Sequence, residues 1–271
     1  MNKPLISVII PARNSGETIK TALDSITGQT YQNLEIIVVD DNSTDNTKEV
    51  VERLVEKDHR IYYYALTEDD PNRIDPFLKR NINAGYAARN FGFTKTTGEL
   101  ITFQDADDAS LLNRIEVQYG LLTKYSATHI CTTIAPFDEK RLGTMLDIKD
   151  ASQEARFINP QELYKLSQAT KGFITKVSPA LNACIPFHFK RLRVINKLFF
   201  GSLAPYPGAG NSPLFKREVV EKVQFRKLAD RVWPSFMGRG ADRDFNFQVA
   251  ETFKNSYVFP IPLYMWSRDR I

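Results

Sequence analysis

Apolar residues along the first half of the chain fall into short continuous runs separated by stripes of helical spacing. The runs Leu5–Ile10, Leu34–Asp40 and Ile61–Leu66 are rich in β-branched and aromatic residues, which predicts buried strands. Glu99–Phe103 predicts a fourth strand. Between these runs, apolar residues recur every three or four positions, as in amphipathic helices. The pattern therefore predicts a regular alternation of strand and helix.

The first predicted helix buries four residues at positions i, i+3, i+4 and i+7, namely Ile19, Ala22, Leu23 and Ile26. Asn14 and Glu17 predict an approximate capping box at its start. Ser43 or Thr44 is predicted to cap the second helix, whose buried stripe comprises Val50, Val51, Leu54 and Val55. The segment "NAGYAARNFGFTKT" predicts a third helix, built from small residues.

Strands that are apolar on both faces and separated by helices favour a mostly parallel sheet with helices on both sides, as in Rossmann-like proteins. Right-handed crossovers place the ends of successive strands along one rim, and ligands bind beyond the carboxyl ends of such strands. Polar segments follow three of the four strands: "PARN", "DDNSTD" and "DADD". We therefore expect these segments to form one site.

The composition is that of an ordinary folded protein of 271 residues, with 42% hydrophobic and 25% charged residues. The net charge of +4 permits phosphorylated ligands or an anionic membrane surface. No Lys/Arg block with interleaved aromatic residues occurs, so no nucleic-acid partner is expected. Cys131 and Cys184 match no metal spacing and are predicted to be buried thiols. The apolar stretch before Pro11 is too short for a signal sequence or a membrane span, which predicts a cytoplasmic protein.

Asp105, Asp107 and Asp108 occur within four positions and repel one another unless a positive group lies among them. A solvated turn is the alternative interpretation, because Asp is common in turns. The first strand is followed by neither a dinucleotide fingerprint nor a P-loop. Carboxylates suit hard cations that bridge diphosphate oxygens. We therefore expect Mn²⁺ or Mg²⁺ and a diphosphate ligand.

Taken together, "SVIIPARN", "VVDDNSTDNT", "NAGYAARNFG" and "FQDADD" resemble the start of a family 2 glycosyltransferase. The resemblance covers roughly the first 125 residues, and its specificity lies in the order of the four motifs. It implies an α/β structure of the GT-A type, with a mostly parallel central sheet flanked by helices and a smaller mixed half. Residues 1–135 would bind a nucleotide-sugar donor and a metal, and residues 136–271 would bind the acceptor.

The resemblance also implies roles for residues at the rim. Pro11 and Asn14 would line the nucleotide pocket. Asp40, with Asp41 beside it, would accept a hydrogen bond from the N3–H of uracil, which favours uracil over cytosine. Capping of the following helix is the alternative role for both aspartates.

Arg89 matches the basic residue that lies near the sugar or the diphosphate, and a solvated surface charge is the alternative. Asp107 would ligate the divalent ion, while Asp105 would contact the ribose or the water shell of the ion. Asp108 would either support these ligands from behind or cap the helix that contains Ile115.

In the second half, "ADRDF" matches a helix start at which family members commonly carry Glu-Asp-x-Asp, so Ala241 stands in place of the Glu. Asp242 would then be the base that deprotonates the acceptor hydroxyl, with helix capping as the alternative. Asp244 matches the downstream acid. A raised pKa, produced by partial burial, would suit such a base. The segment "GAGNSPLFKREVVEKVQF" is expected to form a strand and a helix.

The function implied is an inverting glycosyltransferase that moves a sugar from a UDP-sugar to a glycan or lipid-linked acceptor. One rival is a sugar nucleotidyltransferase, which would need a Gly-rich basic loop after the first strand that "PARNSGET" does not provide. The other rival is a non-catalytic nucleotide-sugar-binding or scaffold protein, suggested by Ala241.

Two further parts of the sequence each allow two interpretations. His188–Phe200 mixes basic and apolar residues, which suits either an anionic membrane or lipid-linked acceptor, or a helix with solvated basic side chains. Peripheral membrane contact is therefore compatible with the sequence. Trp266 either stacks on a sugar ring or packs in the core.

Overall fold

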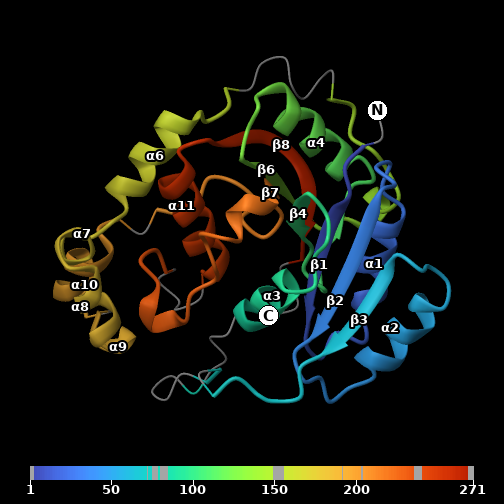
Figure 1. Ribbon diagram of the computed structural model, residues 1–271, viewed down its shortest axis with the longest axis horizontal. Helices are drawn as coiled ribbons and strands as arrows, with labels where there is room; N and C mark the ends of the chain where they lie inside the picture. The colour runs from blue at the N-terminus through green and yellow to red at the C-terminus, as the bar shows by residue number, and fades with distance from the viewer. Residues whose placement is uncertain are drawn as a thin grey trace.

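The computed structural model describes residues 3–71, 73–74, 79, 85–148, 156–190, 192–202, 204–234 and 240–267. Within these ranges an eight-stranded mixed sheet has the order β3-β2-β1-β4-β7-β6-β8-β5 and curls around the molecule (Figure 1). Its strands are β1 Ile6–Ala12, β2 Leu34–Asp40, β3 Ile61–Ala65, β4 Leu100–Phe103, β5 Ala109–Ser110, β6 His129–Pro136, β7 Leu214–Lys216 and β8 Ser256–Trp266.

The α-helices are α1 Ile19–Thr27, α2 Thr47–Val55, α3 Tyr86–Phe93, α4 Arg114–Lys124, α6 Pro160–Ala169, α7 Phe173–Val177, α8 Pro179–Cys184, α9 Phe187–Lys190, α10 Arg193–Phe200 and α11 Ala241–Phe253. The structure also has three short 3₁₀ turns in its described part: η1 Glu139–Arg141, η2 Arg217–Val219 and η3 Leu228–Asp230. In Figure 1, α7 to α10 form a group at one edge, far from β1 to β3. In the part of the chain that the structure describes, no helix combines the length and the apolar composition needed to span a bilayer.

Strands β3, β2, β1 and β4 run parallel to one another, as the strand–helix alternation predicted. Both faces of β1, β2 and β4 are largely buried, whereas β3, at the edge of the sheet, is partly exposed. Val8 and Ile10 share a hydrophobic cluster with α1, whereas Ile9, between them, packs on the opposite face with α3. Strand β7 is antiparallel to both β4 and β6, which makes the second half of the sheet mixed. The predicted GT-A type architecture is confirmed.

An aromatic cluster joins the two halves on the inner face of the sheet. Phe225 and Phe245 stack with ring centroids 4.4 Å apart, and Phe103 lies 5.4 Å and 5.9 Å from these two rings. Phe93 of α3 and Phe215 of β7 complete the cluster. Because Phe103 ends β4 and Phe245 lies near the start of α11, this packing holds the start of α11 close to the loop that follows β4.

Two predicted helix caps are wrong. Helix α1 begins only at Ile19, and Asn14 lies in a left-handed conformation with φ 48°, so the box of Asn14 and Glu17 does not form. Helix α2 begins at Thr47, after both predicted caps. The reason is that the side chains of these loops bond across to each other. Asp45 accepts the backbone N–H groups of Gly16 and Thr47 at 2.9 and 3.0 Å.

Three further predictions need correction. Cys131 is buried as predicted, but Cys184 is exposed because it ends the short helix α8. The helix expected after β7 is only the turn η2, where the Arg217 side chain bonds to the carbonyls of Thr96 and Gly98. His188–Phe200 forms parts of two short helices, α9 and α10, instead of one. Asn83 of the third predicted helix lies outside the described residues.

Helix α3 approaches β1 so closely that Gly92 has no room for a side chain. A Cβ there would lie 2.6 Å from Cγ2 of the buried Ile9. We predict that Gly92→Ala lowers the free energy of unfolding by about 1–3 kcal/mol through overpacking. Urea denaturation followed by circular dichroism measures the change.

Gly120 of α4 is the matched control, because a Cβ there meets no atom within 4 Å. Gly120→Ala should stabilise the protein by about 0.5–1 kcal/mol through helix propensity. Equal effects of the two substitutions would contradict the close packing of α3 on β1.

Candidate active site

A cavity of about 1190 Å³ lies at the carboxyl ends of β1, β2 and β4, as expected for the predicted rim. Its wall also includes Gly85 at the start of α3, the segment Gly208–Asn211, and the beginning of α11. Trp266, at the end of β8, lines it as well, so the core-packing interpretation of this residue is wrong, and its contact with a sugar stays a prediction. Segments distant in the sequence therefore meet at one concave site.

The predicted site residues reach this cavity with one exception. Those in its wall are Pro11, Asn14, Asp41, Arg89, Asp105, Asp107 and Asp242. Asp40 is not part of the wall. Its carboxylate accepts the backbone N–H of Ser43 at 2.9 Å and the hydroxyl of Tyr63 at 2.7 Å. The structure therefore places Asp40 behind the cavity, and its contact with a donor stays a prediction.

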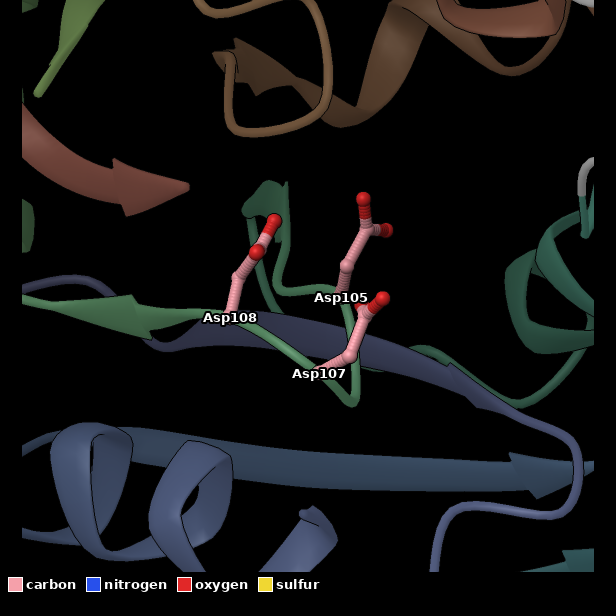
Figure 2. Close-up of side chains that lie close together, drawn as sticks. All are labelled: Asp105, Asp107 and Asp108. Carbon is pink, nitrogen blue, oxygen red and sulfur yellow. The ribbon is translucent and has the colours of Figure 1, made fainter. Parts of the chain in front are cut away.

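The three aspartates after β4 form a compact acidic cluster. Asp105, Asp107 and Asp108 each offer a carboxylate oxygen, and these atoms lie within 4.8 Å of one another. In Figure 2, Asp105 and Asp108 point to the same side of their loop, and the carboxylate of Asp107 lies beside Asp105. Asp107 is exposed and Asp108 is buried. An isolated solvated turn does not describe this arrangement, because one of its acids is removed from water.

Asp108 anchors the end of β8 to the acidic loop. Its Oδ2 accepts the hydroxyl of Tyr264 and its Oδ1 accepts the backbone N–H of Ser267, both at 2.8 Å. The pairing of β5 with β8 sets this register, because Ala109 lies opposite Met265. Asn113 stands at the N-cap of α4, so the predicted capping role of Asp108 is wrong.

Burial, followed by the neighbouring charge of Asp105, raises the pKa of Asp108 to about 8. The hydrogen bonds from Ser267 and Tyr264 act in the opposite direction but do not compensate. In the metal-free protein Asp108 is therefore largely protonated at neutral pH, and a nearby cation would favour its ionised form.

Arg89 and Asn211 orient Asp105 from opposite parts of the chain. Arg89, in the first turn of α3, donates to Oδ1 of Asp105, and the Asn211 amide donates to Oδ2 at 2.9 Å. The Arg89 guanidinium also lies over the rings of Phe103 and Phe225, at 5.7 and 5.4 Å. Arg89 is only 5% exposed, so the alternative of a solvated surface charge is wrong.

Asp41 faces the cavity beside a buried arginine. The guanidinium of Arg73 donates to Oδ1 of Asp41 at 2.6 Å, and both side chains are buried. Arg13 donates to the backbone carbonyl of Asp41. Asn14 joins this loop to the one after β1, because its side-chain oxygen accepts the N–H of Thr44 at 2.8 Å. These contacts fix the two loops relative to each other.

Asp242 and Asp244 have different environments at the start of α11. Gly240 takes the N-cap position and no side chain caps the helix, so the capping role of Asp242 is wrong. Asp242 lines the cavity, and the Asn246 amide ties its carbonyl to that of Gly210.

Asp244 is fully buried, and its contacts are structural. It accepts the N–H groups of Val232 and Trp233 at 2.8 and 2.9 Å. Arg226 pairs with it through two nitrogens. Asp244 therefore fixes the segment before α11 against the helix.

The sequence analysis missed Arg73, Asn211 and Tyr264 as site residues. Arg73 lies in a polar loop without a motif, and Asn211 lies in a run of small residues. Tyr264 belongs to an apolar strand and is recognised only by its bond to Asp108. Each acts through a contact with an acid that is distant in the sequence, so no local signal was available.

Among the described residues, carboxylates outnumber cations in the wall of the cavity. Seven described acids line it, namely Glu17, Asp41, Asp45, Asp105, Asp107, Asp108 and Asp242, against the three described arginines Arg13, Arg73 and Arg89. Grouped carboxylate oxygens are the donor set that Mn²⁺ and Mg²⁺ prefer. The grouped oxygens of Asp105, Asp107 and Asp108, which open on the cavity, therefore fit a divalent cation.

A mixed sheet of this order with an acidic cluster after β4 defines the class of GT-A type proteins. Residues 7–181 match the family model described as "Glycosyl transferase family 2", well over half of the chain. The chain belongs to glycosyl transferase family 2.

Relatives and solved structures agree with this assignment. The chain is 26% identical over 163 residues to Escherichia coli WfgD, described as a "UDP-Glc:alpha-D-GlcNAc-diphosphoundecaprenol beta-1,3-glucosyltransferase". This alignment covers 60% of the chain and 54% of WfgD. The chain spans about half the length, or less, of the curated relatives it matches.

The fold resembles S. aureus TarS 1-349 in complex with UDP-GlcNAc, with a TM-score of 0.59 and 14% identity over 98% of this chain and 59% of the other. It also resembles the Pyrobaculum calidifontis mannosyltransferase PcManGT in complex with GDP-Man and Mn²⁺. Here the TM-score is 0.53 and the identity is 19%, over 96% of this chain and 55% of the other. At these identities the similarity shows the fold alone.

The raised pKa of Asp108 predicts how stability depends on pH. The folded protein keeps this proton up to about pH 8, whereas the unfolded chain releases it near pH 4. Asp108 therefore makes the metal-free protein less stable as pH rises between these values. We predict that Asp108→Asn gains stability relative to the native protein from pH 5 to pH 8, on the order of 2 kcal/mol. Urea unfolding in the presence of a chelator measures it.

Asp45→Asn is the control. Burial acts to raise the pKa of Asp45, but hydrogen bonds from Thr47 and Gly16 lower it overall. Its contribution to the stability of the folded protein is therefore lost only below about pH 5. The stability difference between this variant and the native protein should stay constant from pH 5 to pH 8. A constant difference for Asp108→Asn as well would contradict the burial of an uncompensated acid.

Proposed function

We propose that this protein is a metal-dependent inverting glycosyltransferase that transfers a sugar from a UDP-sugar to a lipid-linked glycan. The observation that carries the proposal is that the acidic cluster and Asp242 line the same cavity. The relative WfgD is named for a UDP-Glc donor and a diphosphoundecaprenol-linked acceptor, which supports this choice of substrates. TarS, of similar fold, was crystallised with UDP-GlcNAc.

In this proposal the donor half comprises residues 1–135. Asp41 accepts the uracil N3–H, because it faces the cavity while Asp40 lies behind it. Arg73 holds the Asp41 carboxylate in place through its bond to Oδ1. Pro11 and Asn14 form the adjoining wall.

Asp107 would ligate a divalent ion, and Asp105 would contact the ion's water shell or the ribose. Such an ion neutralises the charge that develops on the departing UDP. The exposure of Asp107 suits a direct ligand. Asp105 is held in one orientation by Arg89 and Asn211, which suits a residue that positions the donor. The Mn²⁺ in the structure of PcManGT supports this choice of cation.

The acceptor half comprises residues 136–271 and supplies Asp242 as the base. An acceptor hydroxyl becomes an effective nucleophile when a carboxylate takes its proton. The attack proceeds on the face opposite the leaving UDP, so an α-linked donor yields a β-linked product. The name of WfgD states a β-1,3 product, in agreement with inversion. Trp266 would pack against the sugar, because aromatic faces suit this role.

Ala241, which stands where family members commonly carry Glu, also leaves room for a non-catalytic nucleotide-sugar-binding protein. Its side chain is 1% exposed and packs in the aromatic cluster with Phe245. Asp242, next to this alanine, still lines the cavity, which supports the enzyme over the binding module. Turnover decides between them, since only the enzyme releases UDP.

Asp107→Asn tests the metal site. We predict that UDP raises the melting temperature of the native protein more strongly with Mn²⁺ than without, because a ligand of the folded state stabilises it. The variant should lose this Mn²⁺-dependent part of the shift while keeping its melting temperature without ligand. The control is Asp24→Asn, on the exposed face of α1, which should leave the shift unchanged. If Asp107→Asn kept the whole Mn²⁺-dependent shift in melting temperature, Asp107 would not be a metal ligand.

Asp242→Asn tests the base. A panel of UDP-sugars identifies the donor with the largest thermal shift, and UDP release from that donor is then measured. We predict that the variant lowers kcat by about 10²–10⁴-fold, because the acceptor proton has no base. Its affinity for UDP and Mn²⁺ should match that of the native protein. Unchanged kcat would refute Asp242 as the base, and absent turnover in the native protein under every donor and acceptor would favour the binding module.

A further inference from the structure

Large apolar side chains are exposed mainly on one small part of the surface. Among the described residues, eleven large hydrophobic side chains are exposed, and seven of these lie between residues 173 and 198. They include Phe173 (65% exposed), Val177 (68%) and Val194 (84%), which belong to α7 and α10. We call the exposed surface of α7 to α10 the helical face. Figure 1 shows these helices grouped at one edge of the molecule.

The charge of this region has a single sign. Residues 163–217 contain nine Lys or Arg and no Asp or Glu. Lys176 and Lys197 of the helical face are exposed. Lys190 is buried, where its ammonium donates to Asn182 and Ala229, and Lys171 pairs with Glu251 of α11. The helical face therefore combines exposed apolar side chains with cations that no acid of its own segment neutralises.

We propose that the helical face is a docking surface for an anionic phospholipid bilayer. Apolar side chains enter the boundary between headgroups and acyl chains, while neighbouring Lys side chains attract anionic headgroups. Contiguous exposed apolar surface on a folded protein marks an interaction site.

Charge complementarity favours a bilayer over a second copy of the chain. A symmetric dimer through this face would bring the same cations of both copies together. No acidic residue of the 163–217 segment would be available to pair with them. An anionic bilayer supplies the missing negative charge.

The helical face has a firm connection to the cavity wall. Phe187, Phe199 and Phe200 pack with Leu228 of η3, and the amide of Asn182 donates to the carbonyl of Asp230 at 3.2 Å. The chain that follows η3 is held to α11 by Asp244, two residues beyond Asp242. Binding of a bilayer is independent of the proposed function. Its consequence, that a lipid-linked acceptor meets Asp242 from the bilayer, rests on that function.

Co-sedimentation with vesicles tests the proposal. The native protein should bind vesicles of phosphatidylethanolamine and phosphatidylglycerol more tightly than vesicles of phosphatidylcholine, and the preference should weaken at high salt. Phe173→Gln/Val194→Gln should lower binding to both kinds of vesicle by about tenfold or more, because it removes inserted apolar surface. Lys176→Gln/Lys197→Gln should lower binding about tenfold to the anionic vesicles alone.

Matched controls come from other faces of the molecule. Tyr62→Gln/Met145→Gln removes side chains that are 47% and 63% exposed, and Lys57→Gln/Lys140→Gln removes exposed cations. Both control variants should bind like the native protein. Circular dichroism and the affinity for UDP with Mn²⁺ should be unchanged in every variant, so loss of vesicle binding is distinguished from loss of folding or of the donor site.

Equal vesicle binding by the native protein and Phe173→Gln/Val194→Gln would overturn the proposal. Sedimentation equilibrium without vesicles provides a second decisive result. A dimer of the native protein that this variant dissociates would assign the helical face to a second copy. Vesicle binding that persists when UDP binding fails would refute the proposed donor site and leave the docking surface intact.

Discussion

Mutual repulsion among three aspartates is the constraint that the rest of the site must satisfy. Asp105 is held by Arg89 and Asn211, and Asp108 is held by Tyr264 and Ser267. These partners come from α3, the segment before β7, and the end of β8. The fold therefore brings donors from three distant segments to one short loop. They orient the acids, but the hydrogen bonds to Asp108 do not offset burial and the charge of Asp105, which together raise its pKa to about 8.

The aromatic cluster on the inner face of the sheet fixes the distance between the loop that carries the three aspartates and the proposed base, Asp242. Phe103 precedes the aspartates and Phe245 follows Asp242, and both rings belong to one aromatic cluster. Asp244 then holds the preceding segment against α11 through two backbone N–H groups. Packing and a buried carboxylate therefore position the groups that face the cavity. On this account the chemistry depends on residues that never touch the substrate.

Much of the first half could be predicted because its signals are local. Continuous apolar runs give the parallel strands, and polar residues at their ends give the rim on which Asp41, Asp105 and Asp107 lie. The predicted helix caps were wrong because the side chains of Asn14 and Asp45 bond to a neighbouring loop. No local sequence pattern records such a contact. The sequence also did not show that Asp41 faces the cavity while Asp40 lies behind it. This difference depends on the bond of Asp40 to Tyr63, which lies on an adjacent strand. In the second half, packing of short helices against one another decides the structure.

The central claim is that the acidic cluster and the cavity form a site for a cation bound to a nucleoside diphosphate. A crystal structure with UDP and Mn²⁺, measured at the manganese absorption edge, tests it most directly. The account predicts an anomalous peak within bonding distance of Asp107, with diphosphate oxygens on the other side of the ion and the uracil beside Asp41. A peak elsewhere, or UDP bound with the three aspartates free of any ion, would contradict it.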